Sequence, residues 1–145
     1  MLQDFIGAND ISFLLGLILS LFAGFLIGVE RESRGKDAGI STHMLVISGS
    51  MLFTLISFTV DPASPSRIAA NIITGIGFLG AGVILRAGAH IKNLTTAASI
   101  WFAASIGMAF GFGYYFIGIV ATIASIIIPR IPNISGKSPE SKIVP

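Results

Sequence analysis

The residues from Ile68 to Leu85 form an uncharged run of eighteen residues between Arg67 and Arg86. This is about the length that a helix needs to cross a hydrocarbon core of roughly 30 Å. Glycines would weaken a soluble helix by about 1 kcal/mol each, whereas in a membrane small residues let neighbouring helices pack closely. The run therefore predicts the central helix of a compact membrane bundle. The small residues expected at its contacts are Gly75, Gly77, Gly80 and Gly82, with a seam of Ala70, Thr74, Gly77 and Ala81.

Within this run the letters GIGFLG, residues 75–80, match the glycine pattern of dinucleotide-binding proteins. That pattern needs a preceding strand, a soluble helix and an acidic residue about twenty positions further on. Here the glycines lie inside a span bounded by arginines, and residues 100–128 contain no acid. We therefore set nucleotide binding aside.

The composition is that of an integral membrane protein. Hydrophobic residues make up 53% of the 145 residues and charged residues 11%, well below the quarter that is usual in soluble domains. The absence of cysteine excludes disulfides, thiol catalysis and zinc thiolate sites. A net charge of +2 gives no indication of nucleic acid as a partner, and we expect none. No basic residue precedes the first apolar run, so we expect a retained span and not a signal peptide.

Apolar segments predict an all-α, polytopic bundle of five transmembrane helices within one domain, residues 1–130. The spans are expected at about 11–29, 43–60, 68–85, 95–110 and 114–128. Residues 94–128 carry no charge over thirty-five positions, which exceeds one span, and GFGYY at 111–115 is the natural break. Residues 131–145 are polar and proline-rich, and we expect a disordered tail.

The basic residues predict the orientation. With five spans, Arg67 lies alone on one side of the membrane. The other side collects Arg31, Arg34, Lys36, Arg86, Lys92, Arg130, Lys137 and Lys142. Because basic residues favour the cytoplasmic side, we expect the N-terminus outside and the C-terminus in the cytoplasm.

Small residues recur every fourth position in the first and fourth spans. They are Gly16, Ser20, Gly24 and Gly28 in the first span, and Ser99, Ala103, Gly107 and Gly111 in the fourth. Such seams suit close helix crossings. The seam of the first span fits either packing inside the bundle or a homodimer contact, and packing is the simpler interpretation.

One face of the second span is polar, with His43, Ser50, Thr54, Ser57 and Asp61 at helical spacing. The face could pack inward with its hydroxyls bonded to carbonyls one turn back. Alternatively it could line a hydrated ion or proton path, since polar groups at membrane depth usually face a cavity or the bundle interior. We favour inward packing.

The sequence offers no clear catalytic or metal site. His43 and His90 stand apart from acidic pairs. Glu30, Glu32 and Asp37 could hold magnesium loosely, because this ion prefers oxygen ligands and keeps several waters. No nucleophile, base and orienting group recur together, so we expect neither an enzyme nor a cofactor.

Two segments resemble the MgtC/SapB family of bacterial membrane proteins. They are GVERESRGKDAGISTHMLVISGSMLF (28–53) and RIAANIITGIGFLGAGVILRAGAHIKNLTTAASIW (67–101). The resemblance implies five spans with the C-terminus inside and a role in growth at low magnesium and stress adaptation. Family members of the MgtC type are thought to restrain other membrane machines, notably ATP synthase. It also implies a set of candidate functional residues, namely Glu30, Arg31, His43, Arg67, Arg86, Thr95 and Thr96.

The chain departs from the family pattern at Ser41, where Arg is common, and at Asn93, where Gly is frequent. It resembles the short SapB-like form without a soluble C-terminal domain, so we do not transfer the virulence role. The leading hypothesis is a non-enzymatic inner-membrane protein of magnesium or energy homeostasis that acts on another membrane protein. The alternative is a small magnesium or proton carrier or channel component.

Glu30 and Arg86 end the first and third spans on the same side of the predicted membrane. If those spans lie side by side, the carboxylate and the guanidinium could form a bidentate pair. The alternative is that each charge points into the headgroup region, where exposed pairs contribute about 0–1 kcal/mol.

Overall fold

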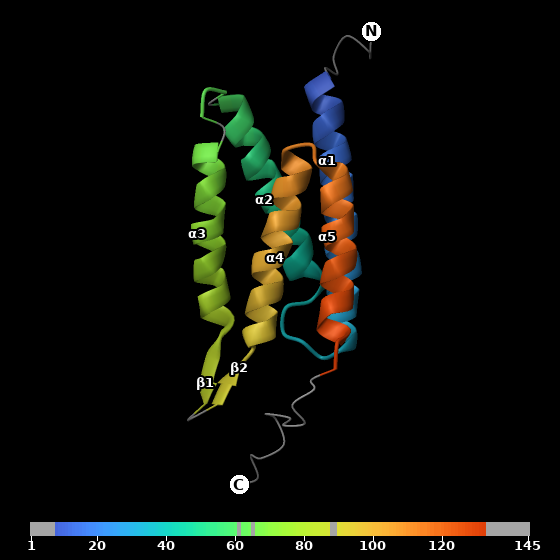
Figure 1. Cartoon of the computed structure of the whole chain (residues 1–145), viewed down its shortest axis with the longest axis vertical. Helices are drawn as coiled ribbons and strands as arrows, with labels where there is room; N and C mark the ends of the chain where they lie inside the picture. Colours follow the sequence, from blue (N-terminus) through green and yellow to red (C-terminus); the bar gives the residue numbers. More distant parts are fainter. Residues whose placement is uncertain (1–7, 61, 65, 88–89, 133–145) are drawn as a thin grey trace.

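A computed structural model describes residues 8–60, 62–64, 66–87 and 90–132 of the chain (Figure 1). Its five α-helices are α1 (Ala8–Ser33), α2 (Ile40–Val60), α3 (Ser66–Val83), α4 (Leu94–Gly111) and α5 (Tyr115–Ile127), followed by the 3-10 turn η1 (Ile128–Arg130). The predicted all-α bundle of five helices is confirmed. By length and composition α1 to α4 could each cross a membrane, and Tyr115–Arg130 forms a shorter apolar helix.

A short β-hairpin follows α3, where the sequence predicted the last residues of a span and a loop. Strand β1 (Leu85–Ala87) pairs antiparallel with β2 (His90–Lys92), and Arg86 lies opposite Ile91. The third helix therefore ends at Val83 and not at the predicted position 85. The hairpin projects from the same end of the bundle as the loop between α1 and α2 (Figure 1).

The long uncharged segment divides into two helices at the predicted break. α4 ends at Gly111 and α5 begins at Tyr115. Gly113 has φ 79°, a left-handed conformation that costs a glycine little. The turn is held by the amides of Gly113 and Tyr114, which donate to the carbonyls of Phe110 and Ala109.

α4 is the central helix of the bundle, because it contacts each of the other four α-helices. α3 lies at one edge and contacts chiefly α4 and α2 (Figure 1). The prediction that the Ile68–Leu85 span is the central helix is therefore wrong. The glycines that suggested it do not all meet a neighbour: a methyl group added at Gly75, Gly77 or Gly82 would find no atom within 4 Å.

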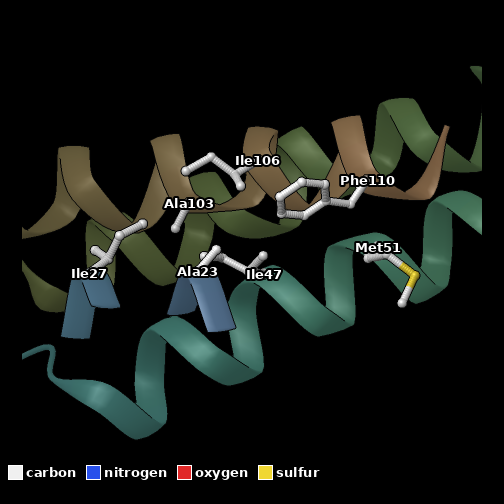
Figure 2. Packing of buried hydrophobic residues seen from close by; sticks show 7 residues of the cluster. All are labelled: Ala23, Ile27, Ile47, Met51, Ala103, Ile106 and Phe110. Atoms are coloured by element: carbon white, nitrogen blue, oxygen red, sulfur yellow. The ribbon is translucent and has the colours of Figure 1, made fainter. Parts of the chain in front are cut away.

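The core lies where α1, α2 and α4 meet. Its buried side chains are Ala23, Ile27, Ile47, Met51, Ala103, Ile106 and Phe110, and Figure 2 shows those of α4 directed toward those of α1 and α2. A second cluster joins α3 to α4 through Ala69, Ile72, Ile76, Ile100 and Ala104, with Ala38 beside them. Because small residues dominate on α4, its neighbours approach closely.

Glycines make the tightest helix contacts, between α1 and α2 and between α2 and α4. A methyl group added at Gly24 would lie 2.5 Å from Cα of Met44. One added at Gly111 would lie 2.6 Å from the carbonyl oxygen of Met51. Gly28 and Gly107 similarly lie against the α2 backbone, at Ile40 and Ile47. The seam of α1 thus packs inside the bundle, as the simpler interpretation expected.

The remaining predicted packing positions vary in how closely they meet a neighbour. Gly16 and Gly80 lie at ordinary van der Waals distance from the next helix, since an added methyl group would find its nearest atom at 3.5 Å and 3.7 Å. Ser20, Ser99 and Ala103 are buried.

The outward faces of the helices are apolar. Large hydrophobic side chains are exposed on every helix, including Phe78 (81% exposed) on α3 and Phe116 (78%) on α5. Apolar exposure on this scale is a liability in water, whereas lipid tails are as apolar as these side chains. The surface is that expected of a bundle surrounded by lipid.

Candidate functional site

Four of the seven candidate residues lie together at the end of the bundle that carries the β-hairpin. Glu30 and Arg31 come from the last turns of α1, His43 from the first turn of α2, and Thr96 from the first turn of α4. With Ser99, one turn further along α4, they form a buried group that we call the polar cluster. These side chains lie at the same level of the bundle, because α1 ends there while α2 and α4 begin there.

Arg31 is the largest fully buried side chain of the cluster, with 1% of its surface exposed. Its Nη2 donates to Oγ1 of Thr96 at 3.2 Å, which ties α1 to α4. Its Nε is buried and has no hydrogen-bond partner among the described residues. A buried guanidinium has five N–H donors to satisfy, so this charge has unused donor capacity inside the protein.

His43 joins α2 to α4. Its Nδ1 lies 2.9 Å from the carbonyl oxygen of Gly39, and its Nε2 lies 3.4 Å from Oγ of Ser99. The Ser99 hydroxyl also donates to the carbonyl oxygen of Thr96 at 2.8 Å. A carbonyl only accepts, so Nδ1 carries a proton. Because Ser99 has one hydroxyl proton and donates it to Thr96, all three contacts can be hydrogen bonds only if Nε2 of His43 is protonated as well. If the ring is neutral, one of the three hydrogen bonds is not made.

Glu30 is also buried, with 4% of its surface exposed. Its Oε1 accepts a hydrogen bond from Nη1 of Arg34 at 3.3 Å, and Nε of Arg130 lies 4.0 Å from the same oxygen. Arg34 also donates to the carbonyl oxygen of Pro129, which fixes the end of α5 against α1. The second oxygen, Oε2, is buried and has no partner in the described part of the chain.

The carboxylates that could have held magnesium each have a different partner. Oε1 of Glu32 accepts the Ile40 amide at 2.9 Å and so caps the start of α2. Oδ2 of Asp37 accepts Nδ2 of Asn93 at 2.6 Å. Within the described ranges no three acidic or histidine side chains gather around a common point. Glu30, Glu32 and Asp37 therefore do not form a shared metal site in this structure.

The other candidates lie outside the cluster. Thr95 is exposed beside Thr96, and Arg67 is exposed at the opposite end of the bundle. Arg86 lies in β1, and its side chain is outside the described residues. The proposed pair of Glu30 with Arg86 required α1 and α3 to lie side by side. That arrangement is wrong, because α2 and α4 lie between the two helices (Figure 1).

The polar face of α2 is buried against the neighbouring helices. His43, Ser50, Thr54 and Ser57 are all buried, and Asp61 lies outside the described residues. Oγ1 of Thr54 donates to the carbonyl oxygen of Ser50, one turn back, at 2.8 Å.

α4 covers this face of α2 with Gly107 and Gly111. On the same helix, the fully buried side chain of Ile47 separates His43 from Ser50. The hydrogen bond of Thr54 to the preceding turn is the arrangement expected for inward packing.

Sequence reasoning did not find the residues that complete the cluster. Ser99 was expected only as a packing position, although its hydroxyl links His43 to the α4 backbone. The contact of Arg34 with Glu30 could have been predicted from sequence, since the two residues are four apart and such residues lie on one face of a helix. The approach of Arg130 from η1 had no sequence signal, because it depends on how α5 returns to the end of α1.

A family model described as the MgtC family matches residues 17–133, which include the whole polar cluster. The chain belongs to the MgtC family. Protein MgtC of Salmonella typhimurium strain LT2 is 47% identical over 111 residues, covering 77% of this chain and 48% of the relative. The Escherichia coli K12 protein named "Putative magnesium transporter YhiD" is 44% identical over 128 residues, covering 82% of this chain and 60% of the relative.

A third relative, the Synechocystis protein named "Uncharacterized protein slr0014", is 43% identical over 103 residues, covering 70% of this chain and 44% of the relative. The chain therefore spans roughly half the length of the curated relatives that it matches. No solved structure matches the chain significantly.

Proposed function

We propose that this chain is a non-enzymatic inner-membrane protein of magnesium or membrane-energy homeostasis, and that it acts by contact with another membrane protein. Membership of the MgtC family and the name of the relative YhiD support the link to magnesium. The observation that carries the proposed mechanism is the buried polar face of α2, which is covered by α4. Such packing favours a closed bundle over a conducting one.

The proposal includes an orientation. The end of the bundle that holds the polar cluster carries Arg31, Arg34, Lys36 and Arg130, while Arg67 lies in the first turn of α3 at the other end. Because positive charge accumulates on the cytoplasmic side, we place the cluster at the cytoplasmic surface of the inner membrane. The N-terminus is then outside.

A partner protein would contact the exposed arginines at the edge of the polar cluster. The side chains of Arg34 and Arg130 are 41% and 63% exposed while both approach the buried carboxylate of Glu30. A partner that presents a carboxylate could bind these guanidinium groups bidentately. By resemblance to MgtC, the ATP synthase is the first membrane partner to test.

The second candidate function is that of a small magnesium or proton carrier. It is favoured by Oε2 of Glu30, which is buried and has no hydrogen-bond partner among the described residues, and by the name of YhiD. Ionisable groups at membrane depth commonly mark ion pathways. In that case the hydroxyls of α2 would have to leave their present hydrogen bonds to line a path.

Reconstitution in liposomes separates the two functions. With magnesium, proton and potassium indicators inside the vesicles, we expect no flux above that of empty liposomes. Thr54→Val removes a buried hydroxyl of α2, and Thr59→Val is a matched control, because Thr59 is exposed and makes the same bond to the preceding turn, to Leu55 at 2.9 Å. Flux that requires the protein and is lost in Thr54→Val but kept in Thr59→Val would refute the proposal and establish the carrier.

A further inference from the structure

A cavity of about 290 Å³ lies at the end of the bundle opposite the polar cluster. At this end α1 and α2 extend beyond the turn that joins α4 to α5 (Figure 1), and residues of both helices and of the turn line the cavity. The buried side chains of Met51 and Phe110 form part of its lining, and so do the exposed residues Ser12 and Gly113. The cavity therefore runs from the surface of the bundle into its core.

Aromatic side chains make up half of the lining, so we call this space the aromatic cavity. The five rings come from α1, α2, the α4–α5 connection and α5, and they belong to Phe13, Phe58, Phe110, Phe112 and Tyr115. The other lining residues are glycine, serine, leucine and methionine, so no charged residue among those described lines the cavity. An anion would therefore find no basic side chain there.

The bundle itself positions two of the five rings. The hydroxyl of Tyr115 donates to the carbonyl oxygen of Ser12 at 3.4 Å, which joins α5 to α1. The ring of Phe110 packs against α5, where a methyl group added at Gly118 would clash with it. Side chains that are already ordered lose little conformational freedom when a ligand binds, so these rings favour binding.

The surrounding lipid limits which ligands the aromatic cavity can select. Lipid tails are as apolar as a leucine side chain, so a saturated apolar molecule gains little by leaving the bilayer for this lining. An aromatic ring offers what a lipid tail does not, because its negative face attracts a cation. Tyr114 and Tyr115 lie at the cavity end of α5, and tyrosine is enriched at the membrane–water interface. A cation dissolved in water can reach that level.

We propose that the aromatic cavity binds an alkylammonium group. Several aromatic rings around one site are the usual means of recognising a quaternary ammonium, whose methyl groups carry the positive charge to the ring faces. The group can belong to a free organic cation or to the ammonium headgroup of a lipid, since both present the same chemistry to the rings.

An NMR titration of the full chain in maltoside micelles tests the proposal, because this detergent carries no ammonium group. The probe is choline, and the comparison is neohexanol, which has the same shape with carbon in place of the charged nitrogen. With the signal of empty micelles subtracted, we expect neohexanol to bind at least about fivefold more weakly than choline. Equal binding of the two, or no binding of choline, would overturn the assignment.

Phe58→Leu removes one ring and keeps an apolar side chain, and Phe53→Leu is its matched control. Both phenylalanines lie on α2 with 57% of their surface exposed, and only Phe58 lines the aromatic cavity. Phe58→Leu should weaken choline binding about two- to fivefold and leave neohexanol binding unchanged, whereas Phe53→Leu should change neither. Equal choline binding by the two variants would overturn the role of the ring.

A second pair of variants tests the position of the site. Leu55→Trp places a bulky ring in the cavity and should abolish choline binding, whereas Leu52→Trp, at an exposed position of the same helix outside the lining, should retain it. Choline binding that survives in Leu55→Trp would overturn the location.

Native mass spectrometry of the chain released from nanodiscs of phosphatidylethanolamine and phosphatidylglycerol separates the two sources of the ammonium group. Retained phosphatidylethanolamine that Leu55→Trp loses would identify a lipid headgroup. Choline binding without retained phosphatidylethanolamine would identify a free organic cation. Preferential retention of phosphatidylglycerol that Leu55→Trp loses would overturn the proposal, because this headgroup carries no ammonium.

Discussion

Replacing Gly24 of α1 by alanine adds a methyl group where the backbone of α2 already lies. The added carbon would be 2.5 Å from Cα of Met44 and 2.6 Å from its amide nitrogen. Backbone atoms cannot rotate away, so the two helices must separate. Inserting a methyl group into a well-packed core typically costs about 1–3 kcal/mol, while removing a glycine from a helix interior returns up to about 1 kcal/mol. The net loss of unfolding free energy for Gly24→Ala is therefore about 0–3 kcal/mol.

A matched substitution isolates the packing cost. Gly77 lies inside α3 with no atom within 4 Å of an added methyl group, so Gly77→Ala changes helix propensity alone. The two variants should differ in unfolding free energy by about 1–3 kcal/mol. Unfolding in mixed micelles, followed by far-UV circular dichroism and by the single tryptophan, Trp101, measures this difference. Equal stability of Gly24→Ala and Gly77→Ala would refute the close contact of α1 with α2.

Two further predictions use the same unfolding measurement. Thr96→Val removes the acceptor of the buried Arg31 guanidinium, so we expect the unfolding free energy to fall by about 1.5–3 kcal/mol. The control Thr95→Val, at an exposed position, should change the unfolding free energy by less than about 0.5 kcal/mol. Equal effects of the two variants would contradict the hydrogen bond. Asn93 has φ 65° and bonds to the α1–α2 loop. Asn93→Ala should be less stable than Asn93→Gly by about 1–2 kcal/mol, because alanine disfavours the left-handed backbone, and the reverse order would contradict that reasoning.

The helices could be predicted from sequence because each is a long apolar segment with charged or turn-forming residues at its ends. The division of residues 94–128 followed from the length of this uncharged segment and from the GFGYY break, and Gly113 marks it in the structure. The hairpin after α3 could not be predicted in this way. Its strands are three residues each, and Leu85 continues the apolar run of the helix before it.

Which helix is central could not be read from glycine content. Glycines permit close packing but do not require it, and Gly75, Gly77 and Gly82 of α3 face open space. α4 is central because its small residues are distributed on several faces, so that α2 and α3 can both approach it, with Gly107 against α2 and Ala104 against α3.

The candidate site was only partly accessible to sequence reasoning. The family resemblance selected Arg31 and His43, but nothing in the spacing of the sequence indicates that both are fully buried. Their partners, Thr96 and Ser99, come from a helix more than fifty residues away. Asn93 directly precedes α4, yet its side chain makes no cap bond and reaches the α1–α2 loop instead.

Everything proposed for the polar cluster depends on five membrane crossings that place it at the cytoplasmic surface. The chain has no cysteine, so single cysteines can be introduced without background. In intact cells, a membrane-impermeant maleimide should label Ala63→Cys, between α2 and α3, and Tyr114→Cys, between α4 and α5. Lys36→Cys, in the loop beside the cluster, should be labelled only after the membrane is permeabilised. Labelling of Lys36→Cys in intact cells would contradict the account. If Tyr114→Cys and Lys36→Cys were both protected in intact cells, that result would contradict it as well.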